Sequence, residues 1–103
     1  MKVKWAPNAK NQLRHTAKYI RGEFGLKAQR EFLQEVHSTN FLLSENPHLG
    51  PVEPLLVGAP TVYRSIVVQR LNKIVYYLTG DHIEVVAFWD VRREPKTLVN
   101  EVG

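Results

Sequence analysis

The spacing of apolar residues changes from helical to alternating along the chain. From 7 to 21 they recur every three or four positions, which predicts an amphipathic helix. A second helix is predicted over 26–44. Only a few residues separate them, and glycine tolerates the backbone of a tight turn, so we expect an antiparallel hairpin. The stripes expected to face the core are Ala9, Leu13, Ala17, Ile20 and Phe24 in the first helix, and Ala28, Phe32, Val36 and Leu43, with Leu33 beside them, in the second.

Four strands are expected around this hairpin. A short one covers 3–6, and Pro7 then suits the first turn of a helix. Residues 45–60 contain four prolines and predict an irregular connection. Strands over 62–69, 73–79 and 83–89 follow, joined by turns so short that neighbours must be antiparallel. We therefore predict a single α+β domain over 1–103, in the order β-α-α-β-β-β, with a small, largely antiparallel sheet packed against the helical hairpin.

The last predicted strand ends in the segment AFWDVRREPKTL, residues 87–98. Alternation places Val85, Ala87 and Trp89 on one face of a core strand. Charged residues follow at once, and Pro95 is expected to stop the strand and direct the tail away from the sheet.

Composition narrows the class of protein. The apolar fraction of 44% is enough to build a core, and there is no cysteine for disulfide or thiolate chemistry. No segment has the ~18 apolar residues of a membrane span, and the first residues do not resemble a signal peptide. We expect a soluble, cytoplasmic protein with no membrane partner.

The net charge is +4, and most of the basic excess lies within residues 1–30, which include the first helix. Its basic residues follow the same spacing as the apolar stripe and form a second stripe about 100° round the helix. Such a surface attracts nucleic acid, an acidic protein or acidic lipid, or it serves solubility alone. The stripe consists of Lys10, Arg14, Lys18 and Arg21.

Several kinds of chemistry are disfavoured. The four histidines, at 15, 37, 48 and 82, show no metal-ligand spacing, so neither a metal site nor a cofactor is expected. The serines lie in no nucleophile motif, and no glycine-rich phosphate loop is present.

Basic and aromatic side chains occur together on the last three predicted strands and the tail. Arg64 is the most informative, because a charge in an otherwise apolar strand needs a partner or a groove. We predict Asp90 as its partner, in a pair that is either structural or functional. The other residues of this set are Tyr63, Arg70, Lys73, Tyr76, Tyr77, Trp89, Arg92, Arg93 and Lys96.

The order of these segments resembles the RelE/ParE toxin superfamily. The resemblance begins at VKWAPNAKNQL, continues through YIRGEFGLKAQREF and LSENPHLG, and ends with VYRSIVV, KIVYYL and IEVVAFWDVRREPKTL. It covers nearly the whole chain, and the last segment is similar to one branch of plasmid-stabilisation proteins. It implies the toxin of a type II toxin–antitoxin pair, with an antitoxin encoded beside it. RelE-like members cut messenger RNA on the ribosome, whereas ParE-like members inhibit DNA gyrase.

The resemblance also implies which residues a nuclease would need. RelE-like members place basic groups on the hairpin strands and after the last strand, and a proton-transfer residue in the tail. Arg64 and Arg92 retain two of the basic positions. Ile66, Ile74 and Leu98 occupy others and carry no charge or titratable proton. This comparison with RelE-like members favours a ParE-like toxin, and we assign no catalytic residue.

Three functions remain open from the sequence. The leading one is a ParE-like toxin that inhibits growth through a cellular target such as DNA gyrase. The alternatives are a ribosome-dependent endoribonuclease using Arg64 and Arg92, and a degenerate toxin that only binds antitoxin. We predict target or phosphate contacts at Arg64, Arg92, Arg93 and Lys96, antitoxin contacts at Lys10, Arg14, Lys18, Arg21 and Tyr76, and structural roles for Trp89 and Asp90.

Overall fold

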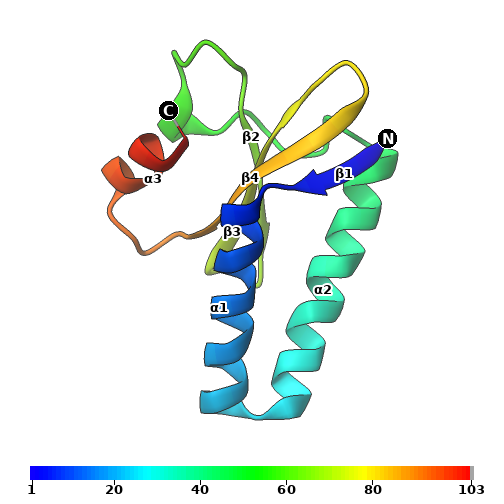
Figure 1. Cartoon of the computed structure of the whole chain (residues 1–103), viewed down its shortest axis with the longest axis vertical. Coiled ribbons are helices and arrows are strands. Elements are labelled where there is room, and N and C mark those ends of the chain that lie inside the picture. The colour runs from blue at the N-terminus through cyan, green and yellow to red at the C-terminus, as the bar shows by residue number, and fades with distance from the viewer. Residues whose placement is uncertain (103) are drawn as a thin grey trace.

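A computed structural model describes residues 1–102, and in it four strands form one mixed sheet (Figure 1). The strands are β1 (Lys2–Trp5), β2 (Arg64–Val68), β3 (Asn72–Leu78) and β4 (His82–Asp90). Their order across the sheet is β1-β4-β3-β2. β1 runs parallel to β4, and the other neighbours are antiparallel. The predicted fold class is confirmed, and so is the order β-α-α-β-β-β as far as β4. The short turns before β3 and β4 make these neighbours antiparallel.

Two long helices form the predicted hairpin, α1 (Pro7–Phe24) and α2 (Leu26–Glu45), which lie side by side in Figure 1. Ala6 precedes α1 without a side-chain cap, and Pro7 occupies the first turn. The helix runs to Phe24 rather than ending at Arg21. The Gly25 amide still donates to the Arg21 carbonyl at 3.0 Å, and the Gly25 φ of 95° then turns the chain out of the helix.

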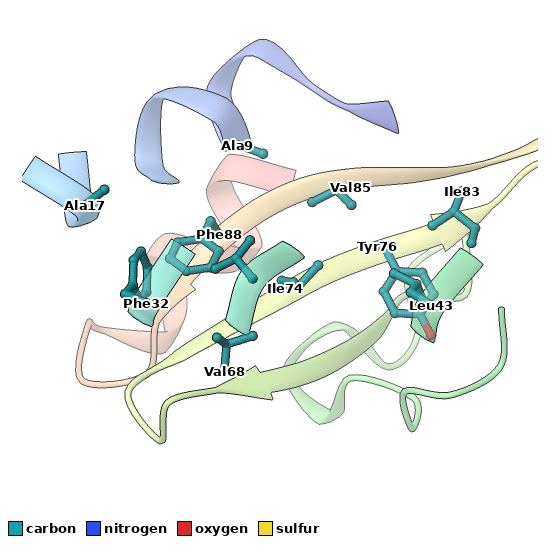
Figure 2. Close-up of a cluster of buried hydrophobic side chains, with 11 residues drawn as sticks. Ala9, Ala17, Phe32, Leu43, Val68, Ile74, Tyr76, Ile83, Val85 and Phe88 are labelled. Atoms are coloured by element: carbon teal, nitrogen blue, oxygen red, sulfur yellow. The ribbon is translucent and has the colours of Figure 1, made fainter. Parts of the chain in front are cut away.

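The hairpin covers one face of the sheet, called here the hairpin face. Figure 2 shows helix and strand side chains meeting in this core, where Phe32 packs edge-on against Phe88. Phe24 and Leu33 were predicted to join it, but they are 70% and 39% exposed. The buried residues of the cluster are Ala9, Ala17, Phe32, Val36, Leu43, Val68, Ile74, Tyr76, Ile83, Val85 and Phe88.

A register shift corrects the predicted faces of β4. Val75 pairs with Ala87, but the next residue, Tyr76, pairs with Val85, so Val86 is an extra residue in β4. A bulge of this kind turns the residues after it to the other face. Val85 therefore packs in the hairpin core, whereas Ala87 and Trp89 pack on the opposite face.

The hydroxyl group of Tyr76 anchors the connection between α2 and β2. The Tyr76 hydroxyl donates to the Pro47 carbonyl at 2.9 Å and accepts from the Gly50 amide at 3.0 Å. Further on, residues 51–53 run beside the start of β2, with the Ser65 amide 3.1 Å from the Pro51 carbonyl. The short 3-10 helix η1 (Pro54–Leu56) follows. The sequence predicted irregular structure for this connection. Backbone and side-chain hydrogen bonds hold the connection in one conformation.

The tail forms a third helix, α3 (Pro95–Val102), which the sequence did not predict. It packs against β4 and η1 on the face away from the hairpin, called here the α3 face. The expectation that Pro95 directs the tail away from the sheet is therefore wrong. Pro95 starts a helix, and burial of Leu98 holds it in place. The buried residues on this face are Leu56, Val75, Ala87, Trp89 and Leu98.

Candidate functional site

Arg64 and Asp90 do not form the predicted pair. Arg64 lies opposite Tyr76, whereas Asp90 lies opposite Asn72 four residues along β3, so at ~3.3 Å per residue they are about 13 Å apart along the strands. One strand also separates them laterally. The half-buried Arg64 instead donates from Nη1 to the Gly50 carbonyl at 2.8 Å. It therefore belongs to the anchored connection.

Asp90 pairs with Arg92 at the end of β4. Its carboxylate accepts from Nε at 3.0 Å and from Nη2 at 2.8 Å, and it also accepts from the Arg92 amide at 2.9 Å. The hydrogen bond from the Arg92 guanidinium is the main cause that lowers the pKa of Asp90, and the same bond raises the pKa of Arg92. Asp90 therefore orients Arg92 and not its predicted partner Arg64.

The Arg93 side chain lies on the opposite side of the end of β4 from the Arg92 side chain. Its guanidinium carbon lies 4.4 Å from the centre of the Trp89 ring, and Nη2 lies 3.1 Å from Glu101 of α3. Glu101 also accepts from Gln12 of α1 at 2.9 Å. Trp89 is buried on the α3 face, and its structural role stays a prediction. Lys96 is exposed in the first turn of α3.

Two grooves flank the end of β4. The first, of about 610 Å³, is called the Arg92 groove, and Tyr19, Phe24 and Leu71 give it an apolar wall. The second, of about 500 Å³, is called the Arg93 groove. His15, Thr16 and Asp90 line both grooves. His15 was assigned no role from the sequence, because nothing in the spacing of α1 indicates that it faces this strand end.

The basic stripe of α1 is exposed as predicted. Lys10 and Arg14 line a third groove of about 600 Å³, called here the β1 groove, whereas Lys18 and Arg21 lie outside it. Within residues 1–102, none of the four is in an ion pair shorter than 4.0 Å. The full lining of the β1 groove is Val3, Lys4, Trp5, Lys10, Leu13, Arg14 and Asn40.

Tyr76 was predicted to contact the antitoxin, and the structure corrects this assignment. Its side chain is 0% exposed in the hairpin core. Burial is also the main cause that raises the pKa of its hydroxyl. Both hydrogen bonds of that hydroxyl are made within the chain, so Tyr76 presents no surface to a partner in this fold.

Two of the three apolar residues at positions that the resemblance assigns to a nuclease are buried, and the third, Ile66, is partly buried. Leu98 is fully buried on the α3 face, and Ile74 is fully buried under the hairpin. The α3 face also holds a charge pair that the sequence did not reveal, between Glu53 and Lys73. Glu53 lies in the irregular connection, where no periodicity indicates its direction.

Glu53 is 0% exposed, and groups of the chain donate to both of its carboxylate oxygens. The Leu55 amide donates to one oxygen at 2.8 Å, and the Ser65 hydroxyl donates to the other at 3.0 Å. Burial pushes its pKa upward, but the hydrogen bonds from Lys73, Leu55 and Ser65 together lower that pKa below its ordinary value. A buried, ionised and fully paired carboxylate is placed to hold the connection on the sheet.

Neither metal ligands nor a membrane segment are evident in the described part of the chain. No three His, Asp or Glu side chains of residues 1–102 gather in a way that could hold a metal ion. None of the described helices has the length and apolar character needed to cross a membrane.

The comparisons with known proteins identify the family. Residues 3–95 match the family described as the ParE toxin of the type II toxin–antitoxin system parDE. The match spans most of the chain, so the chain belongs to the ParE toxin family of type II toxin–antitoxin systems. No curated protein sequence matches it significantly.

Two solved structures have a similar fold. The chromosomal ParDE toxin–antitoxin system of P. aeruginosa gives a TM-score of 0.73 at 17% identity, covering 89% of this chain and 97% of that one. The YoeB dimer of Staphylococcus aureus gives a TM-score of 0.55 at 15% identity, covering 85% and 93%. At these identities the likeness concerns the fold alone, and it agrees with the RelE/ParE-like architecture expected from the sequence.

Proposed function

We propose that this toxin inhibits growth by binding a protein target, with DNA gyrase as the first candidate, and that a cognate antitoxin neutralises it. Membership of the ParE family supports the toxin role. The similar P. aeruginosa protein belongs to a ParDE toxin–antitoxin system, and by analogy we propose that an antitoxin partner exists for this chain.

One observation carries the choice of a binding mechanism over RNA cleavage: the two retained basic residues lie apart. Cleavage needs cations on one phosphate, with a proton-transfer group beside them. Arg64 lies at the start of β2 and is tied to Gly50, whereas Arg92 follows the far end of β4. Leu98, which stands at the expected tail position, is buried. This arrangement favours a surface that binds a protein target over a site that cleaves RNA.

The proposed target surface surrounds the end of β4. Arg92 is 65% exposed and held in one orientation by Asp90. The Arg92 groove beside it contains exposed aromatic side chains, with Tyr19 at 59% and Phe24 at 70%. Exposed aromatic residues next to an oriented arginine are typical of the centres of protein interfaces. Arg93 and Lys96 would extend this surface.

The proposed antitoxin surface is the basic stripe of α1. Its four cations face solvent and have no carboxylate partner within 4.0 Å in the described residues. An acidic, partly disordered antitoxin segment would fold against them on binding.

A supercoiling assay with purified gyrase tests the target. We expect the toxin to inhibit supercoiling, and Arg92→Glu/Arg93→Glu to weaken inhibition about tenfold or more. Lys2→Glu/Arg30→Glu makes the same change in charge at two exposed residues that do not line the Arg92 groove, and it should leave inhibition unchanged. No inhibition by the folded wild-type toxin would rule out gyrase as the target.

A second candidate, ribosome-dependent RNA cleavage, is favoured by the position of His15. Its side chain lines both grooves beside Arg92 and Arg93, so an acid–base group and two cations share one surface. A translation assay with purified ribosomes tests it. Codon-specific cuts that disappear in His15→Asn and in Arg92→Ala would establish cleavage and displace the gyrase proposal.

The third possibility, a degenerate toxin, is tested by induced expression in a heterologous host. We expect growth arrest that co-expression of the neighbouring open reading frame relieves. Normal growth with a stable complex would instead indicate a protein that retains only antitoxin binding.

A further inference from the structure

We propose that the turn between β2 and β3, residues 69–71, is a recognition element, in which Gln69 and Arg70 contact an acidic segment of the toxin's protein target beside the Arg92 groove. This inference rests on the proposed function, since it assumes a target that binds at the end of β4. It adds two residues that were given no contact with the target, and it states the charge of the segment that they meet.

The turn holds two large side chains on an unfavourable backbone. Gln69 has a φ of 49° and Arg70 a φ of 68°, and within residues 1–102 they are the two non-glycine residues with a positive φ. The Leu71 amide donates to the Gln69 carbonyl at 2.7 Å. The chain therefore reverses around Arg70 in a γ-turn with positive φ at its centre, which is a rare and strained turn.

The residues in this turn are not the ones that its backbone favours. Glycine and asparagine adopt a positive φ at lower cost than glutamine or arginine. The side chains of Gln69 and Arg70 are exposed, so packing inside the fold does not explain their presence. Strained backbone that carries unfavourable, solvent-facing residues points to a function for their side chains.

The turn is part of the Arg92 groove. Gln69 and Leu71 line the groove, and Arg70 lies between them in the chain. The Leu71 carbonyl accepts from the Val91 amide at 2.8 Å, which fixes the turn beside the segment that carries Arg92. A partner seated at Arg92 would therefore meet this turn as well.

The charge of the turn favours an acidic segment. Arg70 is in no ion pair shorter than 4.0 Å within residues 1–102. Asp90 lines the groove, but its charge is offset by Arg92. Glu31, which also lines the groove, comes from α2 and lies 4.0 Å from Lys27. The turn thus carries a cation without a partner, and a carboxylate of the target is its complement.

The lining of the groove favours a polypeptide over a nucleic acid. Tyr19, Phe24 and Leu71 line it and are 59%, 70% and 42% exposed, so an apolar side chain of the target would bury them. The two carboxylates in the lining, Asp90 and Glu31, would repel the phosphates of a nucleic acid.

Replacement of the strained residues separates recognition from stability. Gln69→Asn/Arg70→Gly introduces residues that adopt positive φ more readily, so this variant should unfold at the wild-type temperature or higher. Toxicity is measured by titrated expression in a heterologous host. We expect the variant to need about tenfold more toxin than the wild type to arrest growth, because a few contacts carry most of the energy of an interface.

The matched control removes the same two residue types elsewhere. Gln34→Ala/Arg30→Ala changes exposed positions of α2 that do not line the Arg92 groove, and it should leave toxicity unchanged. A turn with only a structural role would lose toxicity and stability together, whereas a recognition element loses toxicity alone.

Single substitutions at Arg70 test the charge. Arg70→Lys keeps a cation and should retain most of the toxicity, whereas Arg70→Gly should lose it. Arg70→Glu should lose more than Arg70→Gly, because it would repel a carboxylate of the target. If Arg70→Glu fails to fold, the comparison of Arg70→Lys with Arg70→Gly decides.

The outcomes distinguish this inference from the proposed function. Growth arrest by the wild type that Gln69→Asn/Arg70→Gly reproduces in full overturns the recognition role and leaves the toxin role intact. No arrest by the folded wild type overturns the proposed function, and this inference with it. Equal losses in Arg70→Lys and Arg70→Gly would overturn the acidic contact. Binding of a single-stranded oligonucleotide that Arg70→Gly abolishes would assign the turn to nucleic acid and overturn the protein contact.

Discussion

Glu53 and Lys73 form an ion pair inside the α3 face of the sheet. The carboxylate is fully buried, and the lysine side chain is 14% exposed. The pair joins the irregular connection to β3, and the Ser65 hydroxyl completes it from β2. A charge pair at this depth holds two segments together only while both members are present.

Removal of one member of this pair should be more damaging than removal of both. We expect Glu53→Gln and Lys73→Met each to lower the free energy of unfolding by about 3 kcal/mol, since each leaves a buried charge without its partner. The double variant Glu53→Gln/Lys73→Met should lose less than the sum of the two single variants. Urea unfolding measures the coupling.

The exposed pair Lys27–Glu31, at 4.0 Å, is the control for this cycle. Lys27→Met and Glu31→Gln should each change stability by about 0.5 kcal/mol or less, because solvent screens exposed pairs. Additive losses at Glu53 and Lys73 would contradict the structural role given to their pairing.

Leu98 should anchor α3. It is fully buried, so Leu98→Ala should cost about 2–5 kcal/mol of unfolding free energy through lost contacts and a cavity. Val99→Ala removes an exposed side chain from the same helix and should cost little. Thermal and urea unfolding compare the two variants, and equal effects would mean that α3 is not held by Leu98.

His82 should make stability depend on pH above the ordinary histidine pKa. Its Nδ1 lies 2.8 Å from Asp81 and its Nε2 lies 2.8 Å from Glu84, and these bonds raise its pKa above 6.5, against the opposing effects of burial and Lys4. The stabilisation is therefore complete below the ordinary histidine pKa and is lost as pH rises through the raised pKa.

The measurement is the free energy of unfolding between pH 5 and 9. The wild-type chain should lose more stability across this range than His82→Gln does. His37→Gln, at an exposed position on α2, should leave the profile unchanged. Parallel profiles for the wild type and His82→Gln would show that the two carboxylate contacts do not persist in solution.

Gly50 should tolerate no side chain. A Cβ atom there would lie 2.6 Å from the Ser65 carbonyl oxygen and 2.9 Å from Ile66, so backbone would have to move. Gly50→Ala should destabilise by about 1–3 kcal/mol. Gly22→Ala has open space and lies in a helix, so it should stabilise by about 0.5–1 kcal/mol. Thermal unfolding of both variants tests whether Gly50→Ala destabilises the protein and Gly22→Ala stabilises it.

Sequence periodicity determined most of the fold. Ala9, Ala17 and Phe32 repeat at helical spacing and do face the hairpin core. The short turns before β3 and β4 left only antiparallel neighbours. These features are local, so the residues that cause them lie close together in the sequence.

Contacts between distant segments decided the rest. The bulge at Val86 separates Val85 from Ala87, and it arises from the pairing of β3 with β4. Leu98 becomes a core residue only because β4 and η1 present an apolar surface to an eight-residue tail helix, too short to be stable without packing.

The segment AFWDVRREPKTL illustrates this division. The sequence by itself determined that an apolar strand is followed by Asp90 and two arginines, because this follows directly from the order of the residues. Only the tertiary structure decided that Asp90 holds Arg92 and that Arg64 turns to Gly50. A charged side chain takes whichever partner the packed backbone brings within about 3 Å, and sequence spacing does not specify that distance.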